Sequence, residues 1–171
     1  EKVALRRAIA LGMDVEREIR LVRRGQAIAA QSAIVPHTSG YDPLFRSEMS
    51  RYDPARAKAL LDVYGYIDHN GDGWRDQPDG APLVLTIATQ SDQNSRQFDE
   101  LWRRNMKAIG LRIQFNVGKW PEQLKAARAG KLMMWTLGGS AGAPDGQGSL
   151  ARFHSLQADG QNLARFKHPR M

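Results

Sequence analysis

The 171-residue sequence contains no cysteine. This absence excludes disulfide bridges, cysteine nucleophiles and thiolate metal sites. The sequence also lacks any apolar run near the roughly 18 residues that a membrane-spanning helix needs, and it shows no secretion signal. Because it starts at Glu1 and enters a helical pattern at once, we expect a fragment of a longer protein. With 42% hydrophobic and 25% charged residues, the chain has an ordinary globular composition and can form one domain with a core.

Signatures of catalysis are missing as well. None of the four histidines lies beside a serine-centred elbow or in a metal-binding pair such as HExxH. The segment 138–142, GGSAG, follows a predicted strand as a nucleophile elbow does, but it runs into Pro144 with no helical pattern after it. No glycine-rich phosphate loop occurs. We therefore expect a protein that is not an enzyme and that uses no nucleotide cofactor.

The charge balance is basic, with 25 Lys and Arg against 18 Asp and Glu, a net charge of +7. Such a balance favours nucleic acid or an anionic membrane as a partner only where the charges are clustered. Here they occur in scattered pairs, and no run of five basic residues exists. Solvated helix faces explain this pattern, so we expect no nucleic-acid partner. A basic nucleic-acid-binding domain remains an alternative class.

The first third of the chain is predicted to be mostly helical. Apolar residues recur at helical spacing in three segments, 2–13, 15–25 and 54–65. Asp14 is suited to cap the second segment, and Asp53 followed by Pro54 is suited to open the third. The weakly patterned segment 26–50 is predicted to be a long loop with one helical turn at 27–30.

The centre of the chain alternates between the two kinds of pattern. Strands are predicted at 83–88, 111–117 and 132–137 because apolar residues alternate there or fill both faces. Between them lie a long helix, capped by Ser91 or Asp92 and ended by Gly110, and a short helix at 121–129. The sequence thus predicts an α/β fold: a β-α-β-α-β core over 83–137, with flanking helices and parallel strands. Residues 138–148 read as a glycine-rich loop, and no period is evident in the last twenty residues.

A ligand site follows from this topology. In open parallel sheets, ligands bind beyond the carboxyl ends of the strands, beside the helix N-termini. The rim is therefore predicted at 89–95, 118–120 and 138–143. Its loops offer hydrogen-bonding side chains, flat aromatic faces and glycines that let a ligand approach the backbone. The predicted ligand-binding residues are Gln90, Ser91, Asn94, Trp120, Trp135, Gly138, Gly139 and Ser140. Trp120 has an alternative role, as a hydrophobic staple for the helix that opens at Pro121.

The segment DHNGDGWRDQPD at 68–79 has the acidic spacing of a calcium loop. Its candidate metal ligands are Asp68, Asn70, Asp72 and Asp79. Asp79 is shorter than the glutamate that usually closes such a loop, and Pro78 stands where a second helix would begin. Asn-Gly and Asp-Gly are also common tight-turn dipeptides. The sequence predicts a turn between a helix and a strand without a cofactor, and a structural calcium or a calcium-dependent interaction module is the alternative.

Several stretches resemble family 5 extracellular solute-binding proteins, the dipeptide-, oligopeptide- and nickel-binding proteins of bacterial ABC importers. The most specific is Tyr52–Gly65, YDPARAKALLDVYG, which is close to the family pattern Y-D-P-x-x-A-K-x-L-L-x-x-x-G. The others are Val3–Arg17 (VALRRAIALGMDVER), Ile34–Phe45 (IVPHTSGYDPLF), the acidic turn at 68–76, and Gln161-Asn162 with Phe166 to Pro169. Their order and spacing cover nearly the whole chain.

The resemblance implies one α/β lobe, residues 1–171, of a two-lobed binding protein whose N-terminal lobe and hinge are absent. Such a protein is periplasmic or lipid-anchored, closes on a peptide or other small solute, and delivers it to a membrane permease. Peptide-binding members often carry an aspartate after the third strand that pairs with the peptide amino group. Here Ser140 or Ala141 occupies that place, with Asp145 further along, which puts recognition of a free amino terminus in question.

Overall fold

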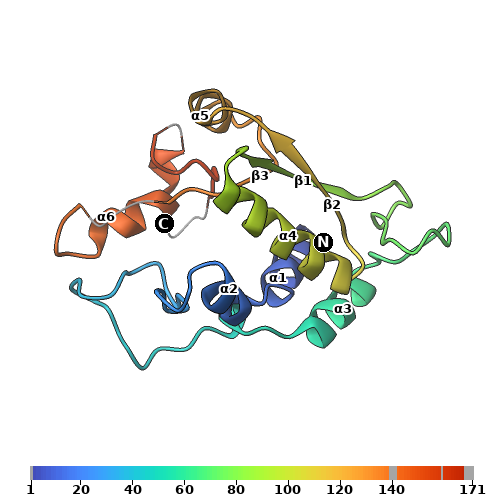
Figure 1. Ribbon diagram of the computed structural model, residues 1–171, viewed down its shortest axis with the longest axis horizontal. Coiled ribbons are helices and arrows are strands. Elements are labelled where there is room, and N and C mark those ends of the chain that lie inside the picture. The colour runs from blue at the N-terminus through green and yellow to red at the C-terminus, as the bar shows by residue number, and fades with distance from the viewer. Residues whose placement is uncertain (1, 139–141, 159, 168–171) are drawn as a thin grey trace.

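The computed structural model describes residues 2–138, 142–158 and 160–167, and Figure 1 shows the arrangement of its elements. The helices are α1 (Lys2–Leu11), α2 (Val15–Leu21), α3 (Pro54–Val63), α4 (Gln93–Ala108), α5 (Trp120–Arg128) and α6 (Gln147–Leu150). The strands are β1 (Val84–Thr89), β2 (Arg112–Val117) and β3 (Met134–Trp135). Short 3-10 turns occupy Glu48–Ser50, Ala151–Phe153 and Ser155–Gln157. In the part of the chain that is described, no helix has the length and apolar character needed to cross a membrane.

Aspartate caps fix where three helices begin. The side chains of Asp14, Asp53 and Asp92 each accept a hydrogen bond from a main-chain amide three residues later, at 2.9 to 3.0 Å. Each bond satisfies an amide that has no partner inside the helix. Asp92 rather than Ser91 therefore caps α4. The hydroxyl of Ser95 also donates to Asp92, and this bond lowers the pKa of the carboxyl below its usual value.

The three strands form one parallel sheet in the order β2-β1-β3. The central strand pairs along its full length with β2, from Val84 opposite Arg112 to Thr89 opposite Val117. It pairs with β3 only through Ile87 and Ala88. In Figure 1, α1, α3 and α4 lie below the sheet and α5 lies above it. The predicted α/β class and β-α-β-α-β core are confirmed.

The main core lies between α1, α3, the end of α4 and the first half of β1. Its fully buried side chains include Leu11, Leu61, Met106, Ile109 and Leu111. Gly12 follows α1 at a point of close approach, because a Cβ there would lie 2.8 Å from a methyl of Ile109. This core holds the N-terminal helices against the βαβ unit.

Three sequence predictions were wrong in detail. β3 has two residues rather than six, because the amide of Thr86 bonds the Met133 sulfur instead of a β3 carbonyl. Residues 27–30 form no helical turn, and the only regular structure within 26–50 is the turn at Glu48–Ser50. α2 ends at Leu21, earlier than predicted, although Gly25 has the positive φ of a helix-closing glycine and its amide bonds the Ile19 carbonyl at 2.8 Å. The segment 142–158 contains three short helical turns that show no sequence period.

Candidate functional site

The carboxyl ends of β1 and β2 are joined by the side chain of Gln123, which is 5% exposed. Its Nε2 donates to the carbonyl oxygen of Thr89 at 2.5 Å and lies 3.4 Å from that of Asn116. The amide of Gly118 also donates to Thr89, at 2.9 Å. The Oε1 atom of Gln123 is buried and has no hydrogen-bond partner among the described residues. Gln123 therefore fixes the strand ends on which the predicted rim is built.

Asp99 lies at the same end of the sheet. It sits on α4 and accepts a hydrogen bond of 3.1 Å from the hydroxyl of Thr89. Partial burial raises the pKa of Asp99, while the Thr89 bond and the Arg103 charge act in the opposite direction. The strand-end region thus combines a polar cluster with a partly desolvated carboxyl.

Gln90, Ser91 and Asn94 lie where the sequence placed them, between the end of β1 and the first turn of α4. Asn94 lines a cavity of about 510 Å³ together with Gln97 and Phe98 of α4. The opposite wall comes from the end of α2 and contributes Arg23 and Arg24. Arg23 pairs with Glu18 at 2.8 Å and lies over the ring of Phe98. We call this cavity the Asn94 pocket; its polar side chains and cations suit a small solute that carries an anionic group.

Trp120 is the first residue of α5 and is 45% exposed. The helix cap is Lys119, which makes no side-chain capping bond. A hydrophobic staple places its apolar residue before the cap, whereas Trp120 follows it, so the staple interpretation was wrong. The exposed indole is free to present an apolar face at the rim.

Trp135 lies elsewhere. It lines a second cavity, of about 570 Å³, together with Trp102, Phe153 and Leu163. No residue lines both this cavity and the Asn94 pocket. Gly138 is exposed, and a Cβ there would meet no atom within 4 Å. Gly139 and Ser140 lie outside the described residues. The structure therefore brings Asn94 together with two arginines, and it places Trp135 in a separate, mainly apolar hollow.

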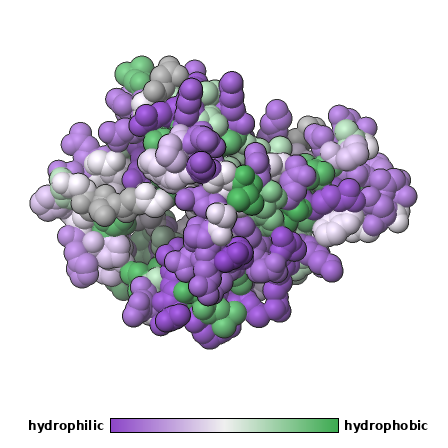
Figure 2. Space-filling view, turned by 45° about the horizontal axis from the view of Figure 1, so that its top comes forward, coloured by the Kyte–Doolittle hydropathy of each residue, from purple (hydrophilic) through white to green (hydrophobic). Residues whose placement is uncertain are grey.

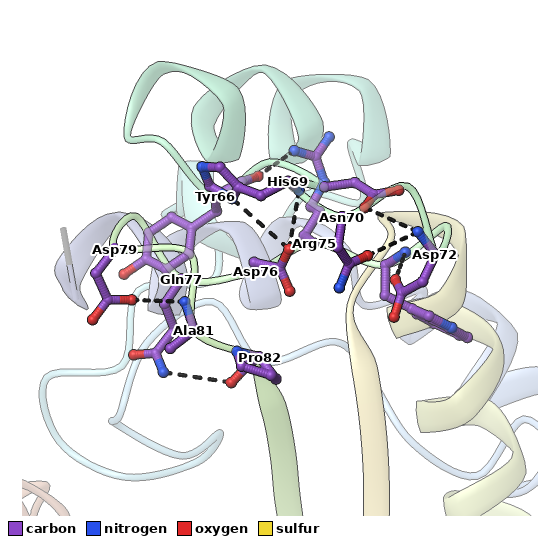
Figure 3. A network of polar contacts seen from close by, with 12 residues as sticks. Tyr66, His69, Asn70, Asp72, Arg75, Asp76, Gln77, Asp79, Ala81 and Pro82 are labelled. Carbon is purple, nitrogen blue, oxygen red and sulfur yellow. Dashed lines mark hydrogen bonds and ion pairs between the residues drawn. The ribbon is translucent and has the colours of Figure 1, made fainter.

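The acidic turn uses its oxygens internally, as Figure 3 shows in part. Both carboxylate oxygens of Asp68 accept main-chain bonds, from Gly71, Asp72 and Gly73, and these lower the pKa of Asp68, that from Gly73 most. Asn70 accepts from the Asp72 amide at 2.9 Å.

Both carboxylate oxygens of Asp72 are also engaged within the protein. It accepts from the Trp74 amide and pairs with Arg112 at 2.7 Å. Asp79 belongs to another turn, where it accepts from Ala81, and lies across Figure 3 from Asn70 and Asp72. Within the described ranges, no group of three or more His, Asp or Glu side chains is placed to hold a metal ion. The structure thus gathers Asp68, Asn70 and Asp72 and leaves Asp79 apart.

Sequence reasoning missed three residues at the strand ends and in the Asn94 pocket. Arg23 and Arg24 were interpreted as part of a solvated helix face, and Gln123 was not singled out. The arginines meet Asn94 only because α2 packs near the start of α4, a contact far apart in sequence. No local sequence signal singles out Gln123; its close approach to Gly118, where a Cβ would lie 3.3 Å from the Gln123 amide nitrogen, is seen only in the structure.

Comparison with known proteins decides the family. Residues 1–161 match the model for bacterial extracellular solute-binding proteins, family 5 Middle. The chain belongs to this family. Its curated relatives include di/tripeptide-binding protein 2 of Pseudomonas aeruginosa, which is 34% identical over 82% of this chain and 25% of that protein.

The fold is shared with solved structures that hold different ligands. The oligopeptide-binding protein AppA of Bacillus subtilis, in complex with a nonapeptide, superposes with a TM-score of 0.83 at 23% identity, covering 98% of this chain and 33% of AppA. NikZ of Campylobacter jejuni, in complex with Ni(L-His), gives a TM-score of 0.81 at 20% identity over 97% and 33%. This family 5 chain spans a quarter to a third of the length of such proteins. The fold alone therefore does not select a ligand.

The loop after β3 is where the family resemblance predicted a departure from peptide-binding members. The candidate replacement aspartate, Asp145, accepts a bond from the Gln147 amide at 3.0 Å, at the start of α6. Its neighbour Pro144 accepts from Ser39 at 2.8 Å, which ties this loop to the segment 34–45. One oxygen of Asp145 is thus engaged locally, and the positions of Ser140 and Ala141 are not described.

Proposed function

We propose that this chain is part of the substrate-binding component of an ABC importer, which captures a small solute between two lobes and passes it to a membrane permease. The observation that carries the proposal is the Asn94 pocket, a polar and cationic cavity beside the N-terminus of α4, in a chain that belongs to family 5. Family membership supports this function over a calcium-dependent module or a nucleic-acid-binding domain. It also supports a role without catalysis, because the relatives are binding proteins by name.

The solute class follows from the pocket. Arg23 and Arg24 supply positive charge, and Asn94 and Gln97 supply neutral donors and acceptors. We infer a peptide or another small polar molecule with a carboxylate held near the two arginines. Gln90, Ser91 and Trp120 extend the rim beyond the pocket, and Ser140 with Gly138 and Gly139 completes it in our proposal. The named ligand of the relative, a di- or tripeptide, is consistent with this class.

The setting is also part of the proposal. The family name describes extracellular proteins, and we propose an exported, periplasmic protein that is held near the membrane by a lipid anchor or by its permease. One lobe offers half of a cleft. Closure by a second lobe removes the solute from water, so we expect weak binding or none by residues 1–171 alone.

The test begins with the full-length protein purified without added ligand. Mass spectrometry of the denatured extract identifies any copurified solute, and calorimetry measures its affinity. Arg24→Ala is expected to weaken binding by about tenfold or more, since a charge-assisted bond is lost. Arg20→Ala is the matched control, because Arg20 is exposed on α2 and does not line the pocket. Equal affinities for the two variants would exclude the Asn94 pocket as the solute site.

A further inference from the structure

A third cavity, of about 770 Å³, lies along α2 and α4 and adjoins the Asn94 pocket. The two cavities share Leu21, Val22, Gln93 and Gln97. Its remaining lining residues are Arg17, Arg96, Glu100, Leu101 and Arg104. We call it the α2–α4 groove. The groove is continuous with the Asn94 pocket, but none of its three arginines lines that pocket.

The groove is strongly cationic. Glu100 is its only acidic lining residue, and this carboxylate pairs with Arg103, which does not line the groove. Within the described part of the chain, Arg17, Arg96 and Arg104 make no ion pair. The Nε atom of Arg17 is buried without a hydrogen-bond partner among the same residues. A buried donor of this kind costs free energy until an acceptor reaches it.

The groove is also apolar between its charges. Leu21 is 54% exposed although it lies at the end of a helix, and Val22 and Leu101 lie beside it. Figure 2 shows hydrophilic side chains over most of one face of the molecule, with apolar residues gathered in separate patches. An apolar centre with an arginine rim is the composition of protein–protein interfaces, where arginine and apolar anchors contribute most of the binding energy.

We infer that the α2–α4 groove docks a segment of a partner protein in which acidic residues flank a leucine-like side chain. The carboxylates pair with Arg96 and Arg104, which line the groove and have no acidic partner of their own among the described residues. The apolar side chain covers Leu21, which is exposed, whereas Leu101 is already buried at the floor of the groove. The partner thus lies next to the solute pocket without entering it, and the inference stands whether or not the solute is a peptide.

The test uses the full-length protein and a blocked, rhodamine-labelled peptide in which glutamate and leucine alternate. Fluorescence anisotropy is expected to show binding that weakens as salt is added. The double variant R96E and R104E is expected to lose at least about tenfold in affinity for this probe. The matched control, K125E and R128E, makes the same charge change on exposed positions of α5 and is expected to bind like the parent.

Two further peptides separate the inference from simple charge attraction. Replacing leucine by alanine in the probe is expected to weaken binding severalfold, and replacing glutamate by lysine is expected to abolish it. The inference is overturned if the parent binds no probe at millimolar concentration, if the α5 control loses as much affinity, or if the alanine peptide binds equally well. Solute affinity, measured in parallel on R96E and R104E, reports on the proposed function independently of these outcomes.

Discussion

Gln123 of α5 donates a hydrogen bond to the carbonyl oxygen of Thr89, the last residue of β1. Gln123→Leu keeps the approximate volume and removes the donor. We expect the free energy of unfolding to fall by about 1–2 kcal/mol, because a buried bond between two elements is lost. Gln114→Leu is the control, since Gln114 is an exposed residue of β2 that bonds the hydroxyl of Thr86 on β1, and its loss is expected to change stability by less than about 0.5 kcal/mol. Urea unfolding measures both, and equal effects would contradict a special role for Gln123.

Arg75 and Arg112 hold the acidic turn in different ways. Arg75 donates to the carbonyls of Ile109 and Tyr66 and pairs with Asp62, with a side chain only 14% exposed. Arg75→Met is expected to cost about 2–3 kcal/mol, because buried carbonyls lose a charged donor. Arg112→Met removes the exposed pair with Asp72 and is expected to cost less than about 1 kcal/mol. Thermal unfolding compares the two, and the reverse order would refute this account.

Two glycines give a matched test of packing. Gly12→Ala is expected to destabilise the protein by about 1–3 kcal/mol, because its Cβ would overlap Ile109. Gly148→Ala is expected to have no effect or to stabilise by up to about 1 kcal/mol, because it lies within helical residues and its Cβ meets nothing within 4 Å. Chemical denaturation of both variants is the measurement. A tolerated alanine at 12 would show that α1 can shift away from α4.

Asp99 and Asp92 are expected to affect the pH dependence of stability with opposite signs. The raised pKa of Asp99 means that the native state binds its proton more tightly, so this group reduces stability as pH rises above 3.8. The lowered pKa of Asp92 means that its contribution is present above 3.8 and is lost as pH falls.

Relative to the parent, Asp99→Asn is therefore expected to gain stability as pH rises towards neutrality, and Asp92→Asn is expected to lose it. Urea unfolding across this range checks both signs. Parallel stability curves for the two variants would show that the pKa of neither carboxyl differs between the folded and unfolded states.

Calcium is expected to leave the acidic turn unchanged. The oxygens of Asp68 already accept main-chain bonds, Asp72 is paired with Arg112, and Asp79 belongs to another turn. Titration to millimolar calcium should alter neither the Trp74 fluorescence nor the melting temperature. A saturable change that Asp68→Asn abolishes, and Asp79→Asn does not, would instead reveal a site built on the first turn. Asp68→Asn is expected to destabilise the turn by itself, because one of two accepting oxygens is lost.

Local rules predicted most of the fold. Asp53 with Pro54, and Asp92 with the apolar face of α4, are signals that act within one turn, so the helices they open were found within a few residues. The fold class and the parallel β-α-β-α-β core followed from alternating patterns and connection rules, whereas the strand order β2-β1-β3 was not predicted. β3 was overestimated because an apolar run does not reveal whether a neighbour pairs with it, and Met133 uses its sulfur where a ladder bond was expected.

The candidate site was less predictable. Asn94 was predicted because strand-end topology places it at the rim, whereas Arg23 and Arg24, which line the same cavity, follow a helix that precedes the sheet in the chain. No local sequence pattern predicts that these two arginines lie close to Asn94. Trp135 was grouped with Asn94 because both lie near strand ends, and the structure separates them because Trp135 lines another cavity, together with Phe153 and Leu163.

The strand that comes first along the chain, β1, ends up in the middle of the sheet. During synthesis, β1 emerges before either of its neighbours. Both edges of this strand, which contains the apolar residues Leu85 and Ile87, therefore stay unpaired until β2 and then β3 have been made. Such parallel, non-local pairing is slow, and it leaves apolar side chains and unpaired backbone groups exposed to aggregation in the meantime. A nascent chain of this protein would therefore depend on chaperones for longest over the stretch from 84 to 135, and Ile87 and Ala88 are the residues at which both late pairings meet.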